Sequence, residues 1–204
     1  MEKKIWELSM YLLLHCLVLT KKVFLSTDEK LEVLIARNAW QKELIWNRFS
    51  MDQLGMSISQ PDKVRRSSQT ISVGNTGNWS TKNYLPMGCL KNKETDSILF
   101  WQIEQNGSWY WEISDQDGHM YLQLSGPTEH QSHWWKNLKP GDTFASVPVS
   151  VGSACGDVEE AAGELTKYRR AIRRKNEDNE KLPVIFNDYM NCLWEDPTTE
   201  KELR

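Results

Sequence analysis

The chain has 204 residues, with 25 basic and 28 acidic side chains and a formal net charge of −3. This length allows a single ordinary hydrophobic core. The balanced charge argues against a general nucleic-acid binder, because such proteins gather Lys and Arg into a surface that neutralises phosphates.

Trp is unusually frequent in this chain, with 10 residues. Two of them are neighbours (Trp134, Trp135), and two alternate along a strand-like segment (Trp109, Trp111). A Trp ring stacks well on the C–H face of a sugar, so carbohydrate binding is one interpretation. Core packing is favoured for most of them, since large aromatic side chains dominate the interiors of β-sandwiches.

The four cysteines stand far apart, at positions 16, 89, 155 and 192, and form no CxxC pair. The four histidines add no metal-ligand spacing, so we expect neither a metal nor another cofactor. Isolated thiols fit a reducing, cytoplasmic compartment. The apolar run at residues 11–19 lacks a cleavage site and is shorter than the about 20 residues of a transmembrane helix, so no membrane partner is expected.

The N-terminal segment, residues 1–40, is difficult to assign. Short apolar runs at residues 11–19, 23–25 and 31–35 suggest strands. From Trp40 to Val73 the pattern becomes polar and strand-like, and residues 74–78 form a turn cluster rich in Gly and Asn.

The clearest structural signal lies between residues 98 and 124. Three runs rich in β-branched and aromatic residues are separated by Asn106-Gly107 and Asp117-Gly118, which are strong hairpin signals. They predict an antiparallel meander, and the alternation at residues 144–151 predicts a final strand. Many short strands with dense turn signals indicate an antiparallel β-sandwich over residues 41–155.

A helix is predicted to begin at Asp157. Asp157 and Glu160 have the spacing of a capping box, and apolar residues follow with helical periodicity. Five basic residues crowd its C-terminal end, where the helix dipole favours cations. The acidic residues at 177, 178 and 180 can neutralise them, which argues against a phosphate site. We interpret residues 156–180 as a linker helix.

Residues 181–204 resemble the start of an α/β unit. The run 183–186 is apolar and β-branched, as expected of a strand covered on both faces. Polar and aromatic side chains follow at once, where strands of parallel α/β folds carry their binding sites. Asp196-Pro197 then begins a helix. One strand and part of a helix are not a domain, so we expect a piece of a longer protein.

Five segments in this order resemble the α-galactosidases (melibiases) of glycoside hydrolase family 36. They are residues 86–88 (PMG), 102–109 (QIEQNGSW), 124–129 (LSGPTE), 165–170 (LTKYRR) and 182–194 (LPVIFNDYMNCLW). The resemblance implies the later part of an N-terminal β-sandwich, a linker helix and the first strand of a truncated (β/α)8 barrel. It also implies a homo-oligomeric enzyme that hydrolyses terminal α-1,6-galactosyl residues of melibiose- and raffinose-type oligosaccharides, with retention and without a cofactor.

The same resemblance points to three substrate-binding residues. Trp194 would wall the galactose site, while Asp188 and Asn191 would hydrogen-bond sugar hydroxyls. Asp188 has a second interpretation, ordering the strand end, and Asn191 a structural turn contact. Glu195 stands where the family usually has Gly.

The catalytic residues implied by the resemblance are absent from this sequence. A retaining glycosidase needs two carboxylates about 5 Å apart. The family carries its nucleophile in a Lys-Trp-Asp motif, which does not occur here. We therefore expect the nucleophile and the acid/base beyond Arg204, and no activity from this chain alone.

Two other functions remain open from the sequence. The first is a stand-alone galactoside-binding sandwich that uses exposed side chains such as Trp79 or Trp134. The second is a structural β-domain whose Trp residues all belong to the core.

Overall fold

The computed structural model describes residues 16–19, 30–56, 69–116 and 119–185. The chain divides into two compact units, residues 1–167 and 168–204. The boundary falls inside helix α3 (Val158–Ile172). No helix in the described ranges combines the length and the apolar character that crossing a bilayer requires.

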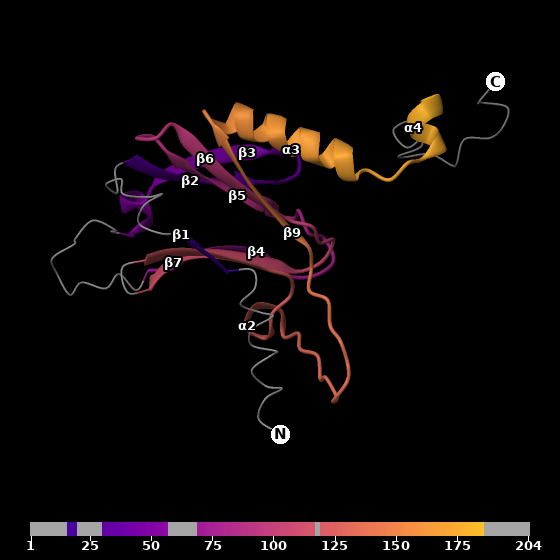
Figure 1. Ribbon diagram of the computed structural model, residues 1–204, viewed down its shortest axis with the longest axis horizontal. Helices are drawn as coiled ribbons and strands as arrows, with labels where there is room; N and C mark the ends of the chain where they lie inside the picture. Colours follow the sequence, from indigo (N-terminus) through magenta and orange to yellow (C-terminus); the bar gives the residue numbers. More distant parts are fainter. Residues whose placement is uncertain (1–15, 20–29, 57–68, 117–118, 186–204) are drawn as a thin grey trace. The chain divides into compact units, whose positions relative to one another are not determined.

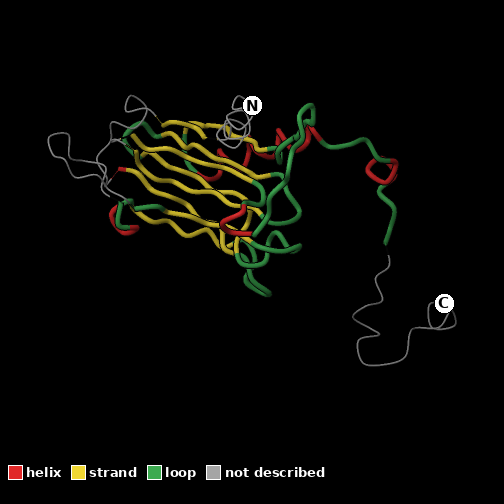
Figure 2. The backbone as a smooth tube through the Cα atoms, turned by 90° about the horizontal axis from the view of Figure 1, so that it is seen from below, coloured by secondary structure: helices red, strands yellow, loops and turns green. Residues whose placement is uncertain are grey.

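The first unit contains two antiparallel sheets that face each other (Figure 1). The five-stranded sheet has the order β3-β2-β5-β6-β9 and the four-stranded sheet the order β1-β8-β7-β4. Figure 2 shows the strands of the sheets side by side, with the longer loops gathered at their ends. The strands are β1 (Cys16–Leu19), β2 (Leu31–Arg37), β3 (Ile45–Ser50), β4 (Ile71–Asn75), β5 (Tyr84–Asn92), β6 (Ser97–Ile103), β7 (Trp109–Gln116), β8 (His119–Ser125) and β9 (Val149–Cys155).

This arrangement confirms the predicted antiparallel β-sandwich and extends it toward the N-terminus. The apolar run at residues 31–35 becomes β2, a central strand paired with both β3 and β5. Residues 16–19 form β1, which pairs with β8. Both strands lie in apolar runs of the N-terminal forty residues that the sequence suggested as strands.

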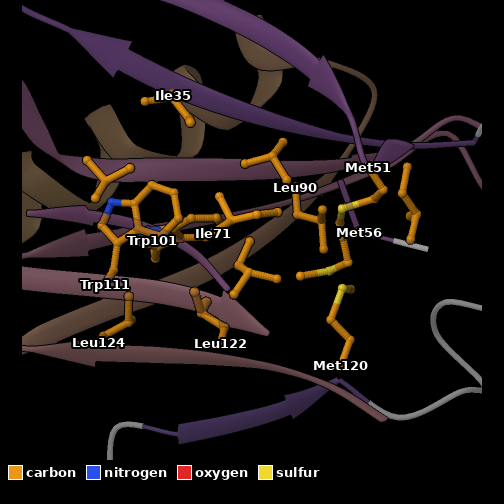
Figure 3. Close-up of a cluster of buried hydrophobic side chains, with 14 of the residues drawn as sticks. Ile35, Met51, Met56, Ile71, Leu90, Trp101, Trp111, Met120, Leu122 and Leu124 are labelled. Carbon is orange, nitrogen blue, oxygen red and sulfur yellow. The ribbon is translucent and has the colours of Figure 1, made fainter. Parts of the chain in front are cut away.

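The main core lies between the two sheets (Figure 3). Its centre is an edge-to-face contact between Trp101 of β6 and Trp111 of β7, whose ring centroids are 5.1 Å apart. Strand β7 shows the alternation that produces this core: Trp109, Trp111 and Ile113 are buried, as the two-residue period of a strand requires. A Trp buries roughly 150–250 Å², which at about 25 cal/mol per Å² stabilises the fold by several kcal/mol.

The predicted hairpin at Asn106-Gly107 is wrong. Strands β6 and β7, which flank it, lie in different sheets, and residues 104–108 cross from one sheet to the other. Pairing β6 with β7 would place Trp101 and Trp111 in the same sheet, whereas stacking them across the core buries both rings almost completely. The second predicted hairpin is confirmed, because β7 and β8 pair from Tyr110–Ser125 to Gln116–His119.

A smaller core lies on the outer face of the five-stranded sheet, beneath α3. Ala161 of α3 is buried there against Leu34, Cys89, Ile98 and Phe100. The central strands are therefore covered on both faces, which explains why β5 is apolar or buried along most of its length. The predicted strand at 144–151 is displaced: it begins at Val149 and continues to Cys155.

The described part of the second unit contains the end of α3 and helix α4 (Glu177–Lys181). Residues 182–185 follow without regular secondary structure, and Leu182, Val184 and Ile185 are strongly exposed. Among the described residues, the first unit also contains the short helices η2 (Asp52–Leu54) and α2 (Glu129–Ser132). The buried barrel strand expected at 183–186 is not seen at residues 183–185, which form no strand and are exposed; residue 186 and all that follow lie outside the described residues.

Candidate functional site

The three substrate-binding residues predicted from the sequence cannot be placed. Asp188, Asn191 and Trp194 all lie outside the described residues. The same holds for Glu195 and for the helix start at Asp196-Pro197. Their assignment to a galactose pocket therefore stays a prediction, and the described residues direct attention to other surfaces.

An ion pair joins β3 to the start of α3 and helps to hold the helix on the sheet. The Arg48 guanidinium is 2.7 Å from Asp157 Oδ1 and 3.5 Å from Glu32 Oε2. The hydrogen bond from Arg48 holds the pKa of the Asp157 carboxyl below its usual value. Asp157 Oδ1 also accepts a 2.7 Å hydrogen bond from the Val158 N–H, and the Asp157 N–H donates to Glu160. The predicted capping box is confirmed in one half, the return of the Glu160 side chain to the Asp157 N–H, whereas the Asp157 carboxylate accepts from Val158 at the first helical position and not from the Glu160 N–H.

A second ionic contact fixes the turn that leads into this helix. The Lys91 side chain is only 7% exposed. Its ammonium group donates hydrogen bonds of 2.5 Å to Asp96 Oδ1 and to the Gly156 carbonyl. The Gly156 N–H in turn donates to the Asp96 carbonyl at 2.7 Å. A buried ammonium requires such partners, so Lys91 is a structural residue that joins the β5–β6 turn to the β9–α3 turn.

A carboxylate held by two phenols lies on the outer face of the four-stranded sheet. Glu112 of β7 accepts hydrogen bonds from the hydroxyls of Tyr110 and Tyr121, the latter at 2.8 Å. Burial, reinforced by the bond to Glu112, raises the pKa of Tyr110 to about 12. The Tyr110 phenol therefore stays protonated near neutral pH and acts as a hydrogen-bond donor to Glu112.

The exposed aromatic side chains gather at one end of the sandwich. We call this the loop end, formed by residues 38–44, 76–83, 104–108 and 126–148, which connect strands whose antiparallel pairing brings these ends together. Within the described residues, every large aromatic side chain that is strongly exposed belongs to these loops. They are Trp40, Trp79, Trp134, Trp135 and Phe144. The hypothesis that all Trp residues are core is therefore wrong.

Two loops that carry these side chains are tied to each other. The Asn38 side-chain amide donates to the Thr81 carbonyl at 2.6 Å, and the Asn38 N–H donates to the Asn83 carbonyl at 2.9 Å. The buried indole of Trp109 donates to the Ser80 carbonyl at 2.7 Å. Trp79, next to Ser80, is thus held at the surface on a backbone anchored to the core.

The loop 126–148 has its own internal supports. Thr128 caps helix α2 by accepting from the Gln131 N–H, and the Trp134 N–H returns to the Thr128 carbonyl at 3.2 Å. A turn follows, in which the Asp142 side chain accepts from the Lys139 N–H at 2.9 Å and the Asp142 N–H donates to the Lys139 carbonyl at 3.0 Å. This turn reverses the chain, so that Phe144 comes back against Trp134.

The resulting arrangement is an aromatic platform, which we define as the side chains of Trp134, Trp135 and Phe144. The rings of Trp134 and Phe144 have centroids 5.7 Å apart and are tilted by 37°. The Lys136 ammonium lies 5.6 Å from the centroid of the Phe144 ring, within the range of a cation–π contact. Trp135 is 65% exposed. The sequence pointed to Trp79 and Trp134 as exposed side chains. It did not point to Phe144, because the alternation at residues 144–151 predicted a strand there.

The titratable side chains near the platform do not form a metal site. His130 lies in α2 and His133 ends that helix in a left-handed conformation. Throughout the described ranges, no three His, Cys, Asp or Glu side chains are grouped as metal ligands would be. The chemistry available at the loop end is stacking and hydrogen bonding.

Comparison with known proteins gives matches to solved structures alone. The chain matches no protein-family description and no curated protein. The GH36 α-galactosidase AgaB from Geobacillus stearothermophilus has a TM-score of 0.63 and 13% identity, over 85% of this chain and 22% of that one. The α-galactosidase from Lactobacillus brevis has a TM-score of 0.55 and 13% identity, over 71% and 18%. A double variant of AgaA from Geobacillus stearothermophilus, in complex with stachyose, has a TM-score of 0.54 and 14% identity, over 75% and 20%.

These similarities establish a shared fold. The chain spans about a fifth of the length of the solved structures it matches. The shared part is mainly antiparallel β-sheet.

Proposed function

We propose that this chain is part of a hydrolase that removes terminal α-galactosyl residues from melibiose- and raffinose-type oligosaccharides. It supplies the β-sandwich and the linker helix that accompany a catalytic barrel. The observation that carries the proposal is the match of 85% of the chain, with a TM-score of 0.63, to an α-galactosidase. The five sequence segments that resemble the same family also support it.

The contacts of the described carboxylates support the proposal that these groups are not the catalytic pair. Retaining hydrolysis needs one ionised carboxylate and one carboxylic acid with a raised pKa. Asp157 is paired with Arg48, Asp96 with Lys91, and Glu112 accepts from two phenols. The hydrogen bond from Arg48 lowers the pKa of Asp157, so this carboxyl is unsuited to protonate a leaving group. The contacts of Asp96 and Glu112 hold these two side chains in structural roles. In this proposal Trp194, Asp188 and Asn191 contribute to the sugar pocket, and the catalytic pair belongs to another part of the enzyme.

The test compares the recombinant chain with the form of the protein present in cells. An antibody raised against the sandwich captures the native form, and pre-immune serum provides the control. We expect the captured form to release nitrophenol from p-nitrophenyl-α-galactoside and not from the β-anomer. The recombinant chain of 204 residues is expected to give no turnover. A captured form without activity on any α-galactoside would overturn the proposal, as would turnover by the purified recombinant chain.

A further inference from the structure

The aromatic platform takes no part in the proposed hydrolysis of α-galactosides. Its three side chains lie in one loop, residues 126–148, and each is strongly exposed: Trp134 by 39%, Trp135 by 65% and Phe144 by 38%. Leaving such apolar surface in water forgoes stabilisation of about 25 cal/mol per Å². Clustered exposure of this kind is typical of binding surfaces.

The loop presents these rings in a preformed arrangement. Helix α2 with its Thr128 cap supports one side, and the Lys139–Asp142 turn supports the other. The contacts of Phe144 with the Trp134 ring and the Lys136 ammonium restrict it further. A ligand that stacks on rings already fixed in place loses less of its binding energy to ordering the protein.

The chemistry of the loop indicates the class of ligand. All three strongly exposed large apolar side chains of residues 126–148 are aromatic. Flat aromatic rings match the C–H face of a pyranose ring. The same loop carries polar side chains that can hydrogen-bond hydroxyls: His130, His133, Lys136, Asn137 and Asp142. Of these, the Lys136 ammonium lies 5.6 Å from the centroid of the Phe144 ring.

The charge of the loop indicates that the ligand is neutral. Residues 126–148 contain two basic side chains, Lys136 and Lys139, and two acidic ones, Glu129 and Asp142, so with His neutral their formal charges sum to zero. An anionic membrane or a nucleic acid would require a basic excess. A neutral sugar requires none.

We propose that the aromatic platform of Trp134, Trp135 and Phe144 binds a neutral oligosaccharide. The choice of raffinose-type sugars as ligands rests on the proposed function. Such a surface holds a sugar chain close to the enzyme between hydrolytic events. Longer oligosaccharides therefore bind more tightly than disaccharides, because they cover more of the ring surface.

The test measures binding of stachyose, raffinose and melibiose to the recombinant chain by saturation-transfer NMR and calorimetry. The double variant W134A/W135A is expected to weaken stachyose binding at least tenfold. The matched controls W79A and W40A, which remove exposed Trp side chains from other loops, are expected to change it less than twofold. Because all four side chains are exposed, each variant should keep the circular dichroism spectrum of the parent chain.

Three results would overturn the platform. They are no stachyose binding by the parent chain at high millimolar concentration, unchanged binding by W134A/W135A, and an equal loss in W79A. A separate test uses oxidation of exposed indoles by N-bromosuccinimide in the native form. Protection of Trp134 and Trp135 without sugar would mean that another polypeptide segment covers them, which also overturns the proposal. Activity of the captured native form is measured separately. Hydrolysis of an α-galactoside by that form, together with unchanged stachyose binding by the recombinant W134A/W135A variant, would remove the platform and leave the hydrolase.

Discussion

Arg48 on β3 and Asp157 at the start of α3 are 109 residues apart in the sequence, yet their side chains lie 2.7 Å apart. The contact joins one edge strand of the five-stranded sheet to the helix that follows the other edge strand. Asp157 also caps α3. The pair therefore positions the first turn of the helix over the small core that contains Ala161 and Leu34.

Replacing Asp157 should separate capping from ion pairing. Asn is as good a cap as Asp but carries no charge, whereas Ala removes both contributions. We expect Asp157→Ala to lower the free energy of unfolding by about 1 kcal/mol, within the usual 0.5–2 kcal/mol of a lost cap. Asp157→Asn should cost less than about 1 kcal/mol, because the ion pair is partly exposed. Urea denaturation measures both, and equal losses would show that capping is unimportant here.

The stability contributed by Asp157 should depend on pH in the acid range. Its pKa is lower in the folded protein than in the unfolded chain, so the folded state binds fewer protons there. The contribution is present above the unfolded pKa, about 3.9, and is lost as pH falls through the folded value. The free energy of unfolding of the parent chain should therefore fall more steeply below about pH 4 than that of Asp157→Asn. Parallel curves for the two proteins would contradict the lowered pKa.

Lys91 and Lys93 form a matched pair of lysines in and just after strand β5. Lys91 is buried and donates to the Gly156 carbonyl, whereas Lys93 is 50% exposed and pairs with Glu32 at 2.6 Å. Lys91→Met leaves that carbonyl without its donor and should cost about 1–3 kcal/mol of unfolding free energy. Lys93→Met removes a surface ion pair and should cost less than about 1 kcal/mol. Equal midpoints in urea would show that the buried ammonium is not needed to join the two turns.

Two glycines should respond to alanine in opposite directions. A Cβ at Gly88 would lie 2.5 Å from Cζ2 of Trp101, a fully buried ring. Gly88→Ala should therefore destabilise the protein by about 1–3 kcal/mol through overpacking. A Cβ at Gly163 of α3 meets nothing within 4 Å. Gly163→Ala should stabilise by about 0.5–1 kcal/mol, because Ala is the better helix former. Thermal unfolding of both variants checks the two signs.

Local signals in the sequence predicted the parts of the fold that depend on neighbours in the chain. The alternation of Trp109, Trp111 and Ile113 defined the buried face of β7, and the spacing of Asp157 and Glu160 located the start of α3. The choice between hairpin and crossover at residues 104–108 depended on the contact of Trp101 with Trp111, which joins different sheets. A turn signal such as Asn106-Gly107 does not contain that information.

The sequence likewise predicted only those parts of the candidate site that depend on neighbours in the chain. The sequence named Trp79 and Trp134 as exposed, and both are. It did not reveal that Phe144 returns to the Trp134 ring, because that contact depends on the turn at Lys139–Asp142 and on the point where β9 begins. The substrate-binding roles of Asp188, Asn191 and Trp194 stay predictions.

The position of Cys89 makes its thiol a probe of how often helix α3 separates from the sheet. The thiol lies in the small core beneath α3, is 4% exposed, and has a pKa raised by burial to about 12. It cannot react with a disulfide reagent while the helix is seated, because the reagent needs an accessible thiolate. In a chain whose other three cysteines are replaced by Ser, the labelling rate of Cys89 therefore reports how often α3 lifts from the sheet.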